Sequence, residues 1–599
     1  MFYSEDKQQL TKLNRRMFSL YLLKFSLFSL LGYRLFDIQI AQSEKYKTLS
    51  KNNQIDLEII LPVRGEIYDR NNILLTSNKR VYDLSLIPEK TISIKDTLDN
   101  LSEYIDISFA DRLKIIEFSK KIKKFHKIKL AENIDWNILE QIESNKFKLP
   151  GIAIDEDYIR VYPKHEHFSH ILGYINKPNQ KDMTLPFVSK MPNLKIGKSG
   201  IESTFNSVLI GAPGQREVEV NSNGRLIREI SRKESTKGKN IKLTIDSKIQ
   251  EYAFNKLKTY RAGSIVVMNI ENGQVICMVS VPTYNSNKII KKPNKKYWDT
   301  LLSNKLSPLT FRSIQGLYSP GSTFKMIVAI AGLKYGLINN ESNIFCTGKI
   351  EFGDRTYHCW KTQGHGRMNL IDGIKESCDV FFYDLAKKIG IDRISEVAFD
   401  FGLGTVYDFE LKNQKSGIIP SKKWKKEIKG ENWYAGETLI TGIGQGYILV
   451  NPLQLAVMTS IIASNGKNVK PSLIHKENSN FKVNEKYKNE ILIIKKAMFK
   501  VVNEYKGTAF KSKLANLDFS GKTGTSQVKK ISLLERESED FRKKEIEWKD
   551  RDHALFVGYM PSSKPKYSIS VVVEHGGSGA ATAAPIAKDI FNYIYKLGL

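Results

Sequence analysis

Apolar residues form one long run near the N-terminus. The run lies within residues 17–40 and reads MFSLYLLKFSLFSLLGYRLF, with Lys24 in its interior and Arg34 near its end. A helix of this length would span about 30 Å, the thickness of one hydrocarbon core. The basic residues among 1–16 would keep that tail in the cytoplasm. The run therefore predicts an uncleaved transmembrane anchor, and a signal peptide cleaved after Ala41-Gln42-Ser43 is the alternative.

The stretch after the apolar run has short strand-like and turn-rich patterns, which predict a first domain at 41–239. Charged and apolar residues alternate in a helical rhythm from Thr91 to Lys148, which suits a small inserted subdomain. The polar, basic residues 231–240 predict a linker to the next domain. Three charged residues are expected to form a structural ion-pair cluster: Arg64, Asp69 and Arg70.

The remaining residues, 240–599, show strand patterns, then helical patterns, then strands again. Strand-like stretches flank Glu271-Asn272-Gly273, an Asn-Gly signal for a tight hairpin. Strands return at 553–560 and 567–574, before a last helix at about 584–597. This order predicts an α+β fold whose antiparallel sheet is flanked by helices. The charged residues 526–552 predict a loop of undefined role.

Three short motifs follow one another in the second domain. The first, Ser322-Thr323-Phe324-Lys325, comes after Pro320-Gly321 and opens an apolar helical run. The others are Ser377-Cys378-Asp379 and Lys522-Thr523-Gly524-Thr525. A serine hydroxyl is a weak nucleophile and needs an adjacent base, and residues three apart on a helix share a face. We therefore expect Ser322 and Lys325 to form a hydrogen bond and the trio to carry out acyl transfer.

The amino-acid composition adds little to the predicted fold and acyl-transfer chemistry. The formal net charge is +29, from 93 Lys and Arg against 64 Asp and Glu, and basic residues occur in every segment. No zinc finger, RNP or helix-turn-helix pattern accompanies them, so the sequence predicts no nucleic-acid partner. A basic surface facing anionic membrane or cell-wall polymer is one explanation, and a lysine-rich composition bias is the other.

The motifs and their surroundings resemble those of class B penicillin-binding proteins. Further stretches that carry this resemblance are Arg64-Gly65-x-Ile67-x-Asp69-Arg70, Gly444-Gln445-Gly446, Pro452-Leu453-Gln454-Leu455-Ala456 and the single apolar run. Within that class the chain is most similar to the elongation subfamily, penicillin-binding protein 2. The stretches behind this choice are Tyr357-His358-Cys359-Trp360-Lys361, Gly364-His365-Gly366, Asp379 and Asp552-His553-Ala554-Leu555-Phe556.

The resemblance implies a peptidoglycan D,D-transpeptidase that acts on the D-Ala-D-Ala end of stem peptides, maintains cell shape and is a target of β-lactams. It also implies a pedestal or dimerisation-like domain, attachment to the bacterial inner membrane, and a periplasmic catalytic domain. The expected partners are a SEDS-family glycosyltransferase and other elongation-complex proteins. The alternatives are a division-type transpeptidase, a β-lactam sensor or non-catalytic scaffold, and a β-lactamase, which lacks support because no Glu-x-x-Leu-Asn element follows the second motif.

The resemblance also implies a role for each motif residue. Ser322 would be the nucleophile and Lys325 its base, kept neutral by apolar neighbours and a second cation. Ser377 would relay protons between Lys325 and Lys522 toward the leaving amine. Lys522 would hold the substrate carboxylate electrostatically, and the backbone N–H groups of Ser322 and Thr525 would form the oxyanion hole. Gly524 would let the substrate lie against the strand. The expected substrate-binding residues are Asp379, Thr523, Gly524 and Thr525.

The four cysteines have two interpretations. Cys277 sits in a predicted buried strand and is expected to be a core residue. Outside the cytoplasm, Cys346 and Cys359 would by default form a disulfide and leave Cys378 unpaired. The spacing C-x12-C-x5-H-x12-C also offers three thiolates and an imidazole, the composition of a structural zinc site. The resemblance favours one structural zinc ion held by Cys346, Cys359, His365 and Cys378.

Overall fold

The computed structural model describes residues 3–185, 188, 191, 194–221, 226–290, 295–339, 341–475, 481–529 and 546–598. Most of the predicted charged loop at 526–552 lies outside these residues. The chain forms two compact units, each assembled from several segments. Unit 1 comprises Met1–Val63, Val81–Asp157 and Gly211–Lys237, and unit 2 comprises Arg64–Arg80, Tyr158–Ile210 and Gly238–Leu599.

Unit 1 begins with helix α1, Tyr3–Phe36, which continues through a π-helical turn into α2, Ser43–Gln54. The predicted anchor lies almost entirely within α1. In the part of the chain that the structure describes, no helix has both the length and the apolar character that crossing a membrane requires. The transmembrane anchor expected at 17–40 stays a prediction.

A small antiparallel sheet forms the next part of unit 1. Its order is β1-β8-β9, with bounds Ile55–Ile60, Gly214–Val220 and Leu226–Lys233. The predicted linker at 231–240 is wrong at its start, because residues 231–233 still belong to β9. Cross-strand polar pairs hold this polar strand in place: Ser231 Oγ donates to Glu217 Oε2 at 2.9 Å, and Arg228 Nε donates to Glu219 Oε2 at 2.7 Å.

The helical rhythm in the first domain corresponds to a separate small core in unit 1. Strand β4, Ile128–Ala131, accompanies helices α3, Ile94–Leu101; α4, Phe109–Lys121; and α5, Trp136–Ser144. Buried leucines and isoleucines, among them Leu84, Leu98 and Ile142, join these elements into one cluster. The inserted subdomain predicted from the sequence is therefore present.

Unit 2 contains the predicted antiparallel sheet, whose strand order is β12-β11-β19-β18-β17. The strands are β11, Gly263–Asn269; β12, Val275–Val281; β17, Ser520–Ser526; β18, His553–Met560; and β19, Tyr567–Val573. Every neighbouring pair is antiparallel. At the hairpin, Gly273 has φ of +73° and Asn269 Oδ1 accepts from the backbone N–H groups of Glu271 and Asn272, which confirms the predicted turn.

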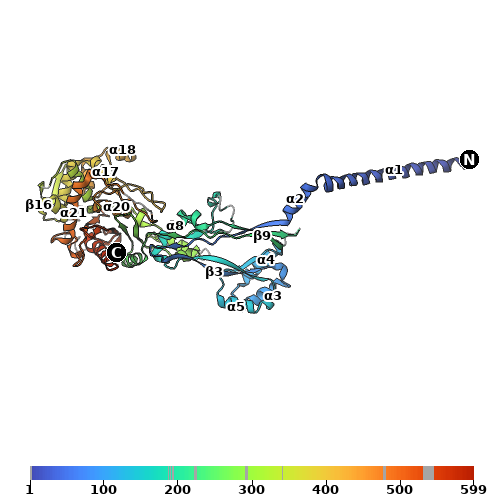
Figure 1. Ribbon diagram of the computed structural model, residues 1–599. Helices are drawn as coiled ribbons and strands as arrows, with labels where there is room; N and C mark the ends of the chain where they lie inside the picture. Colours follow the sequence, from blue (N-terminus) through green and yellow to red (C-terminus); the bar gives the residue numbers. More distant parts are fainter. Residues whose placement is uncertain are drawn as a thin grey trace. The chain divides into compact units, whose positions relative to one another are not determined.

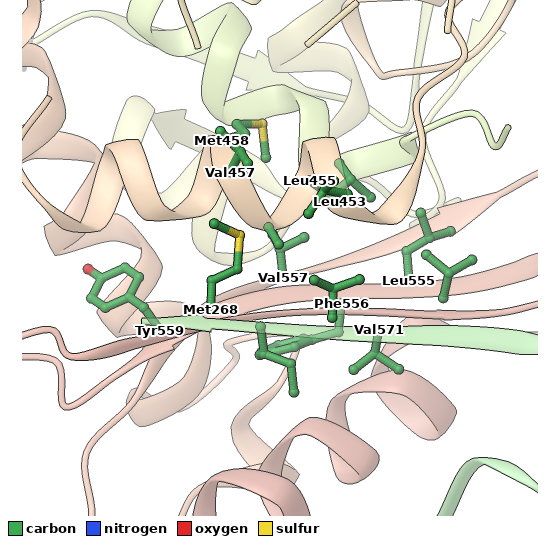
Figure 2. Close-up of a cluster of buried hydrophobic side chains, with 14 of the residues drawn as sticks. Met268, Leu453, Leu455, Val457, Met458, Leu555, Phe556, Val557, Tyr559 and Val571 are labelled. Carbon is green, nitrogen blue, oxygen red and sulfur yellow. The ribbon is translucent and has the colours of Figure 1, made fainter. Parts of the chain in front are cut away.

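Helices cover both faces of this sheet. Helix α20, Pro452–Ala463, is buried along its whole length and packs against β11, β18 and β19. Figure 2 shows Val457 and Met458 of this helix above Met268 and Val557 of the sheet. Helix α10, Ser247–Leu257, packs against β12, and α24, Ala584–Lys596, packs against β18 and β19. Strands β11, β12 and β19 are buried throughout, as expected of a sheet covered on both faces.

The middle of unit 2 is helical, as predicted. It contains α14, Lys325–Lys334; α15, Leu370–Lys375; α16, Asp379–Ile389; α17, Ile391–Asp400; α19, Ala435–Gly442; and α21, Lys488–Asn503. Figure 1 shows α17, α20 and α21 gathered in this unit. Helix α14 packs against α16, α17 and α21, so the helix that follows the first serine motif lies in the centre of the helical layer.

A buried ion-pair cluster forms in unit 2, but with a partner that the sequence analysis did not name. Glu202 is fully buried and accepts from Arg64 Nε at 2.6 Å and from Arg160 Nε at 2.7 Å. Burial by itself raises the pKa of Glu202, but the two guanidinium groups outweigh burial and lower it. The expected Arg64–Asp69–Arg70 cluster is wrong, because Asp69 instead accepts from three backbone N–H groups.

Candidate active site

The first serine motif begins at a turn that only glycine can form. Gly321 has φ of +54°, and a Cβ placed on it would lie 2.6 Å from the carbonyl oxygen of Thr525. Its N–H donates to Gly444 O at 2.9 Å. Residues Gly321–Phe324 form one 3-10 turn that leads into α14, and Ser322 is partly exposed on that turn. The predicted helix start is confirmed, and it is pinned between β17 and the Gly444 segment.

The second motif lies at the end of α15. The N–H of Ser377 donates to Ile374 O and that of Cys378 donates to Gly373 O, the two hydrogen bonds of a Schellman motif. Ser377 occupies its left-handed position, with φ of +57°, where glycine is usual. A left-handed serine costs roughly 1–2 kcal/mol. Strain of this kind persists where the surroundings over-determine it, and it is common at functional sites.

The third motif forms β17, which is the edge strand of the sheet. Lys522 is completely buried on this strand, whereas Thr525 is exposed. Packing alone already requires glycine at 524, because a Cβ there would lie 2.9 Å from Thr323 Cγ2 and 3.0 Å from Pro320 O. The role expected for Gly524 toward the substrate stays a prediction. The hydroxyl of Thr523 is 2.7 Å from that of Thr508.

The three motifs meet at the hydroxyl of Ser377. Its Oγ is 3.2 Å from Lys325 Nζ and 2.9 Å from Lys522 Nζ. Lys325 Nζ also donates to Ser377 O at 2.9 Å and to Asp379 Oδ1 at 2.7 Å. Both amino groups are buried, so these acceptors replace the water that they have lost. The structure thus brings Lys325, Ser377, Asp379 and Lys522 into one polar centre.

The hydrogen bond expected between Ser322 and Lys325 is not formed. The three acceptors of Lys325 Nζ belong to Ser377 and Asp379, which are better placed than the neighbour three residues away. Catalytic hydrogen bonds are often long in free enzymes and tighten only when substrate binds. Ser322 and the exposed Thr525 still lie on neighbouring segments, because the backbone of Thr525 passes against Gly321.

The two lysines have different electrostatic surroundings. Asp379 provides a carboxylate 2.7 Å from Lys325 Nζ, which compensates a positive charge there. Burial first, and then the charge of Lys325, hold the pKa of Lys522 well below its ordinary value, while Asp379 opposes this shift. This shift favours the neutral form of Lys522, beside a Lys325 whose charge Asp379 compensates. Such a pair suits a site that passes one proton between two nitrogen atoms.

Three cysteines and one histidine gather beside the second motif. One ligand atom from each of Cys346, Cys359, His365 and Cys378 lies within 4.8 Å of the others. None of the four cysteines forms a disulfide, so the alternative Cys346–Cys359 bridge is absent. The pKa of Cys359 is lowered, first by a hydrogen bond from Cys378 and also by His365, which favours a thiolate in the cluster.

The cluster fits a tetrahedral zinc ion. Zinc bonds of about 2.3 Å to sulfur and about 2.0–2.1 Å to nitrogen, at tetrahedral angles, place sulfur and nitrogen about 3.5–3.6 Å apart. The Nδ1 atom of His365 lies 3.6 Å from Cys346 Sγ and 3.5 Å from Cys359 Sγ. All three cysteines are buried, as is usual for a closed structural site. The donor set and its spacing therefore suit this metal.

Cys378 faces the cluster for a reason other than strand alternation. In an extended segment, successive side chains point to opposite sides, which would carry Cys378 away from Ser377. The segment is not extended, because Ser377 is left-handed and Cys378 is the N-cap of α16. This turn separates the two side chains, so Ser377 reaches the lysines while Cys378 reaches the cluster.

Some residues of the site were not assigned a role from the sequence. Trp360 donates its backbone N–H to Asp379 Oδ2 at 2.8 Å, and Gln445 Nε2 donates to Thr525 O at 3.2 Å. Thr508 holds the hydroxyl of Thr523. Trp360 and Gln445 stand in stretches that carry the family resemblance, whereas Thr508 stands in none of them. Their partners are 15 to 80 residues away in sequence, so no local pattern assigned these contacts.

Comparison with protein families gives two matches along the chain. A model described as the penicillin binding protein transpeptidase domain matches residues 263–592. A second model, the penicillin-binding protein dimerisation domain, matches residues 59–243. The first match contains all three motifs and the cysteine cluster.

Curated relatives resemble nearly the whole chain. The peptidoglycan D,D-transpeptidase MrdA of Salmonella typhimurium is 33% identical over 592 residues, which cover 95% of this chain and 94% of the relative. MrdA of Escherichia coli is 32% identical over 579 residues, which cover 94% of this chain and 90% of the relative.

Solved structures are also similar to nearly the whole chain. Penicillin-binding protein 2 (PBP2) of Helicobacter pylori, in complex with MreC, is 28% identical with a TM-score of 0.78, covering 91% of this chain and 99% of that one. PBP2 of Pseudomonas aeruginosa, in complex with WCK 5153, is 29% identical with a TM-score of 0.67, covering 90% and 96%. A structure titled as the coordination of polymerization and crosslinking by a peptidoglycan synthase complex is 26% identical with a TM-score of 0.69, covering 96% and 97%.

Proposed function

Since this chain belongs to the class B penicillin-binding proteins, we propose that it cross-links peptidoglycan stem peptides during cell-wall elongation. The reaction class is that of a serine D,D-transpeptidase, which the relatives named MrdA carry in their names. The observation that supports this function most strongly is the Ser377 hydroxyl, held between Lys325 and Lys522, with Ser322 on the turn that leads into α14. A Ser-Lys site of this form needs no separate histidine base.

In the proposed acylation step, Ser322 Oγ attacks the carbonyl carbon of the penultimate D-Ala. The Ser322 proton passes to Lys325, and the bond to the terminal D-Ala breaks. That D-Ala leaves as an amine and takes a proton from the site. The backbone N–H groups of Ser322 and Thr525 would stabilise the oxyanion, and each such donor is typically worth about 3–4 kcal/mol. An amine of a neighbouring stem peptide then attacks the acyl-enzyme, which restores Ser322 and forms the cross-link.

The second motif supports this step by moving protons. Lys325 must be neutral to accept the Ser322 proton, yet it faces the carboxylate of Asp379. Ser377 Oγ is within hydrogen-bond distance of both lysine nitrogens, and the lowered pKa of Lys522 favours the neutral amine that such a transfer needs. A transfer from Lys325 through Ser377 to Lys522 would free Lys325 as the base and give Lys522 the positive charge that attracts a substrate carboxylate.

The edge position of β17 suits a substrate that binds as an added strand. An edge strand offers unpaired backbone groups on its outer side, and an extended peptide is able to pair with them. Thr525 is exposed on this strand, so its hydroxyl is available to the substrate. Lys522 is buried and would act on the substrate through its electric field. Thr523 would act by holding the strand in place through Thr508.

We also propose one structural zinc ion on Cys346, Cys359, His365 and Cys378. The ion would supply no reaction chemistry and would instead tie the segments of these residues together. Cys378 directly follows Ser377, and Cys359 Sγ accepts from the backbone N–H of Asp379 at 3.4 Å. The ligands would therefore hold the second motif from the side opposite the lysines.

Two further proposals concern partners. The Helicobacter pylori relative was solved with MreC, and another similar structure is titled as a peptidoglycan synthase complex. We propose that this chain likewise works with elongation-complex proteins, and that a SEDS-family glycosyltransferase provides the glycan strands. No polymerase domain is among the two family descriptions that match the chain.

Localisation at the inner membrane, through α1 and with unit 2 in the periplasm, is a separate proposal. Large apolar side chains of α1 are exposed, among them Phe18, Phe28 and Leu30. Apolar surface of this extent is unfavourable in water, so it favours a lipid or protein partner.

The function is tested with the purified chain, a fluorescent penicillin and a synthetic stem pentapeptide with an amine acceptor. We expect one penicillin per molecule, attached at Ser322 when the labelled peptide is identified by mass spectrometry. We also expect release of D-Ala with formation of the cross-linked product. Labelling at another residue, or hydrolysis of penicillin at every turnover, would contradict a transpeptidase and favour a sensor or a β-lactamase.

A further inference from the structure

Trp360 is more than half exposed, yet its indole N–H makes two hydrogen bonds inside the active site. The side chain is 59% exposed. Its Nε1 atom lies 3.1 Å from Glu376 O and 3.1 Å from Ser377 O. Glu376 is the C-cap of α15 and Ser377 follows it, so neither oxygen atom has a partner within the helix. The indole N–H therefore supplies a donor to both residues, and Ser377 is the one that carries the relay hydroxyl.

The backbone of Trp360 contacts the second motif as well. Its N–H donates to Asp379 Oδ2 at 2.8 Å, while Asp379 Oδ1 accepts from Lys325 Nζ at 2.7 Å. The carboxylate is thus held at both oxygens, and its orientation toward Lys325 depends on Trp360. Ser377 O receives a second donor, Lys325 Nζ at 2.9 Å. One residue consequently contacts both polar partners of Lys325.

The ring of Trp360 is itself held in place. It packs edge-on against His365 with ring centroids 5.3 Å apart. Its neighbour Cys359 accepts from the N–H of Asp379 at 3.4 Å. The left-handed backbone of Ser377 costs energy, so it needs contacts of this kind to persist.

We propose that Trp360 is a positioning residue that sets the Ser377 hydroxyl and the Asp379 carboxylate against Lys325. This inference rests on the proposed acyl transfer. Trp360 itself touches neither Ser322 nor Lys325, so its effect passes through Ser377 and Asp379. Such a residue changes the rate of the chemical step and leaves the initial binding of penicillin unchanged.

The test compares Trp360→Phe with Trp433→Phe, both in the full chain. Phenylalanine at 360 keeps an aromatic ring and the backbone N–H but removes the donor to Glu376 O and Ser377 O. Trp433 Nε1 donates to Thr438 Oγ1 at 2.8 Å and to no motif residue, so its loss is a matched control. Penicillin labelling at several concentrations gives the limiting acylation rate constant and the dissociation constant of the non-covalent complex separately. Rates are taken per labelled molecule, so a smaller folded fraction does not mimic the effect.

We expect Trp360→Phe to lower the limiting rate constant by about tenfold, the size of one lost hydrogen bond, with an unchanged dissociation constant. Trp433→Phe should match the wild type in both. Equal rate constants in the wild type and Trp360→Phe would overturn the inference, as would a slower rate with loss of bound zinc, which would assign the effect to the metal cluster. If the wild-type chain fails to react, the proposed function fails instead.

Discussion

The hydroxyl of Ser377 lies 2.9 Å from Lys522 Nζ, although 145 residues separate the two in sequence. Ser377 reaches this position from a left-handed turn at the end of α15, and Lys522 reaches it from a buried position on the edge strand of the sheet. This contact joins the helical layer to the sheet at the place where the reaction is proposed to occur.

Replacing Ser377 should separate activity from stability. Ser377→Gly removes the relay hydroxyl, so penicillin acylation should fall at least about a hundredfold, the lower range for general acid–base catalysis. Glycine also adopts a positive φ without strain, which offsets the loss of an acceptor for the two buried lysines, so the melting temperature should change little. Ser460→Ala, which removes a buried serine hydroxyl 2.7 Å from that of Ser568, is the control and should acylate normally. Full-rate acylation by Ser377→Gly would contradict the relay.

Lys522 should make stability depend on pH in a specific direction. Its pKa in the folded protein is well below the ordinary 10.5. At a pH between the folded and the unfolded pKa of Lys522, the unfolded chain binds more protons than the folded one, so the free energy of unfolding rises with pH. Below the folded pKa, Lys522 is charged in both states, and the cost of burying that charge lowers stability most. Lys522→Met should therefore raise the melting temperature at neutral pH, and the gain should shrink toward pH 10.5. A gain that is constant over this range would show that Lys522 is not the group responsible.

The same shift predicts the pH dependence of acylation. A neutral Lys522 accepts a proton through Ser377, so the acylation rate of the wild type should rise as pH increases through the folded pKa of Lys522. Lys522→Met should be slower by about a hundredfold or more and should lose this rise. Stopped-flow labelling over pH 5–9, measured with the Ser460→Ala control, tests the prediction. A pH profile that Lys522→Met shares with the wild type would refute it.

Loss of a ligand in the cysteine cluster should lower both metal content and stability. The wild type should contain about one zinc and no disulfide, by metal analysis and thiol counting. Cys359→Ser should lose most of the zinc, melt at a lower temperature and acylate more slowly, because metal binding is coupled to folding. Cys277→Ser is the matched control, since Cys277 is a buried thiol outside the cluster. A metal-free wild type with normal acylation would rule the site out.

The purified chain should form cross-links but no glycan strands. The family descriptions that match it are a transpeptidase domain and a dimerisation domain. Incubation with lipid-linked precursor should therefore yield no polymer until a polymerase is added. Polymer made by the chain alone would show that a glycosyltransferase activity had been missed.

The amino-acid sequence by itself was sufficient for the elements and the motifs. The hairpin at Asn272-Gly273, strands β18 and β19, helix α24 and the helix start at Ser322 all follow from short-range patterns. These patterns work because turn chemistry and apolar periodicity act between residues that are close in sequence.

Only the tertiary structure decided which polar groups are partners. The sequence predicted that Lys325 would face Ser322, but its acceptors belong to residues more than 50 positions away, Ser377 and Asp379. Arg64 likewise pairs with Glu202 at a separation of 138 residues. A buried charge takes whichever partner the packing of helices and strands brings within reach, because leaving it unpaired costs several kcal/mol. That choice depends on the whole fold, and no local pattern contains it.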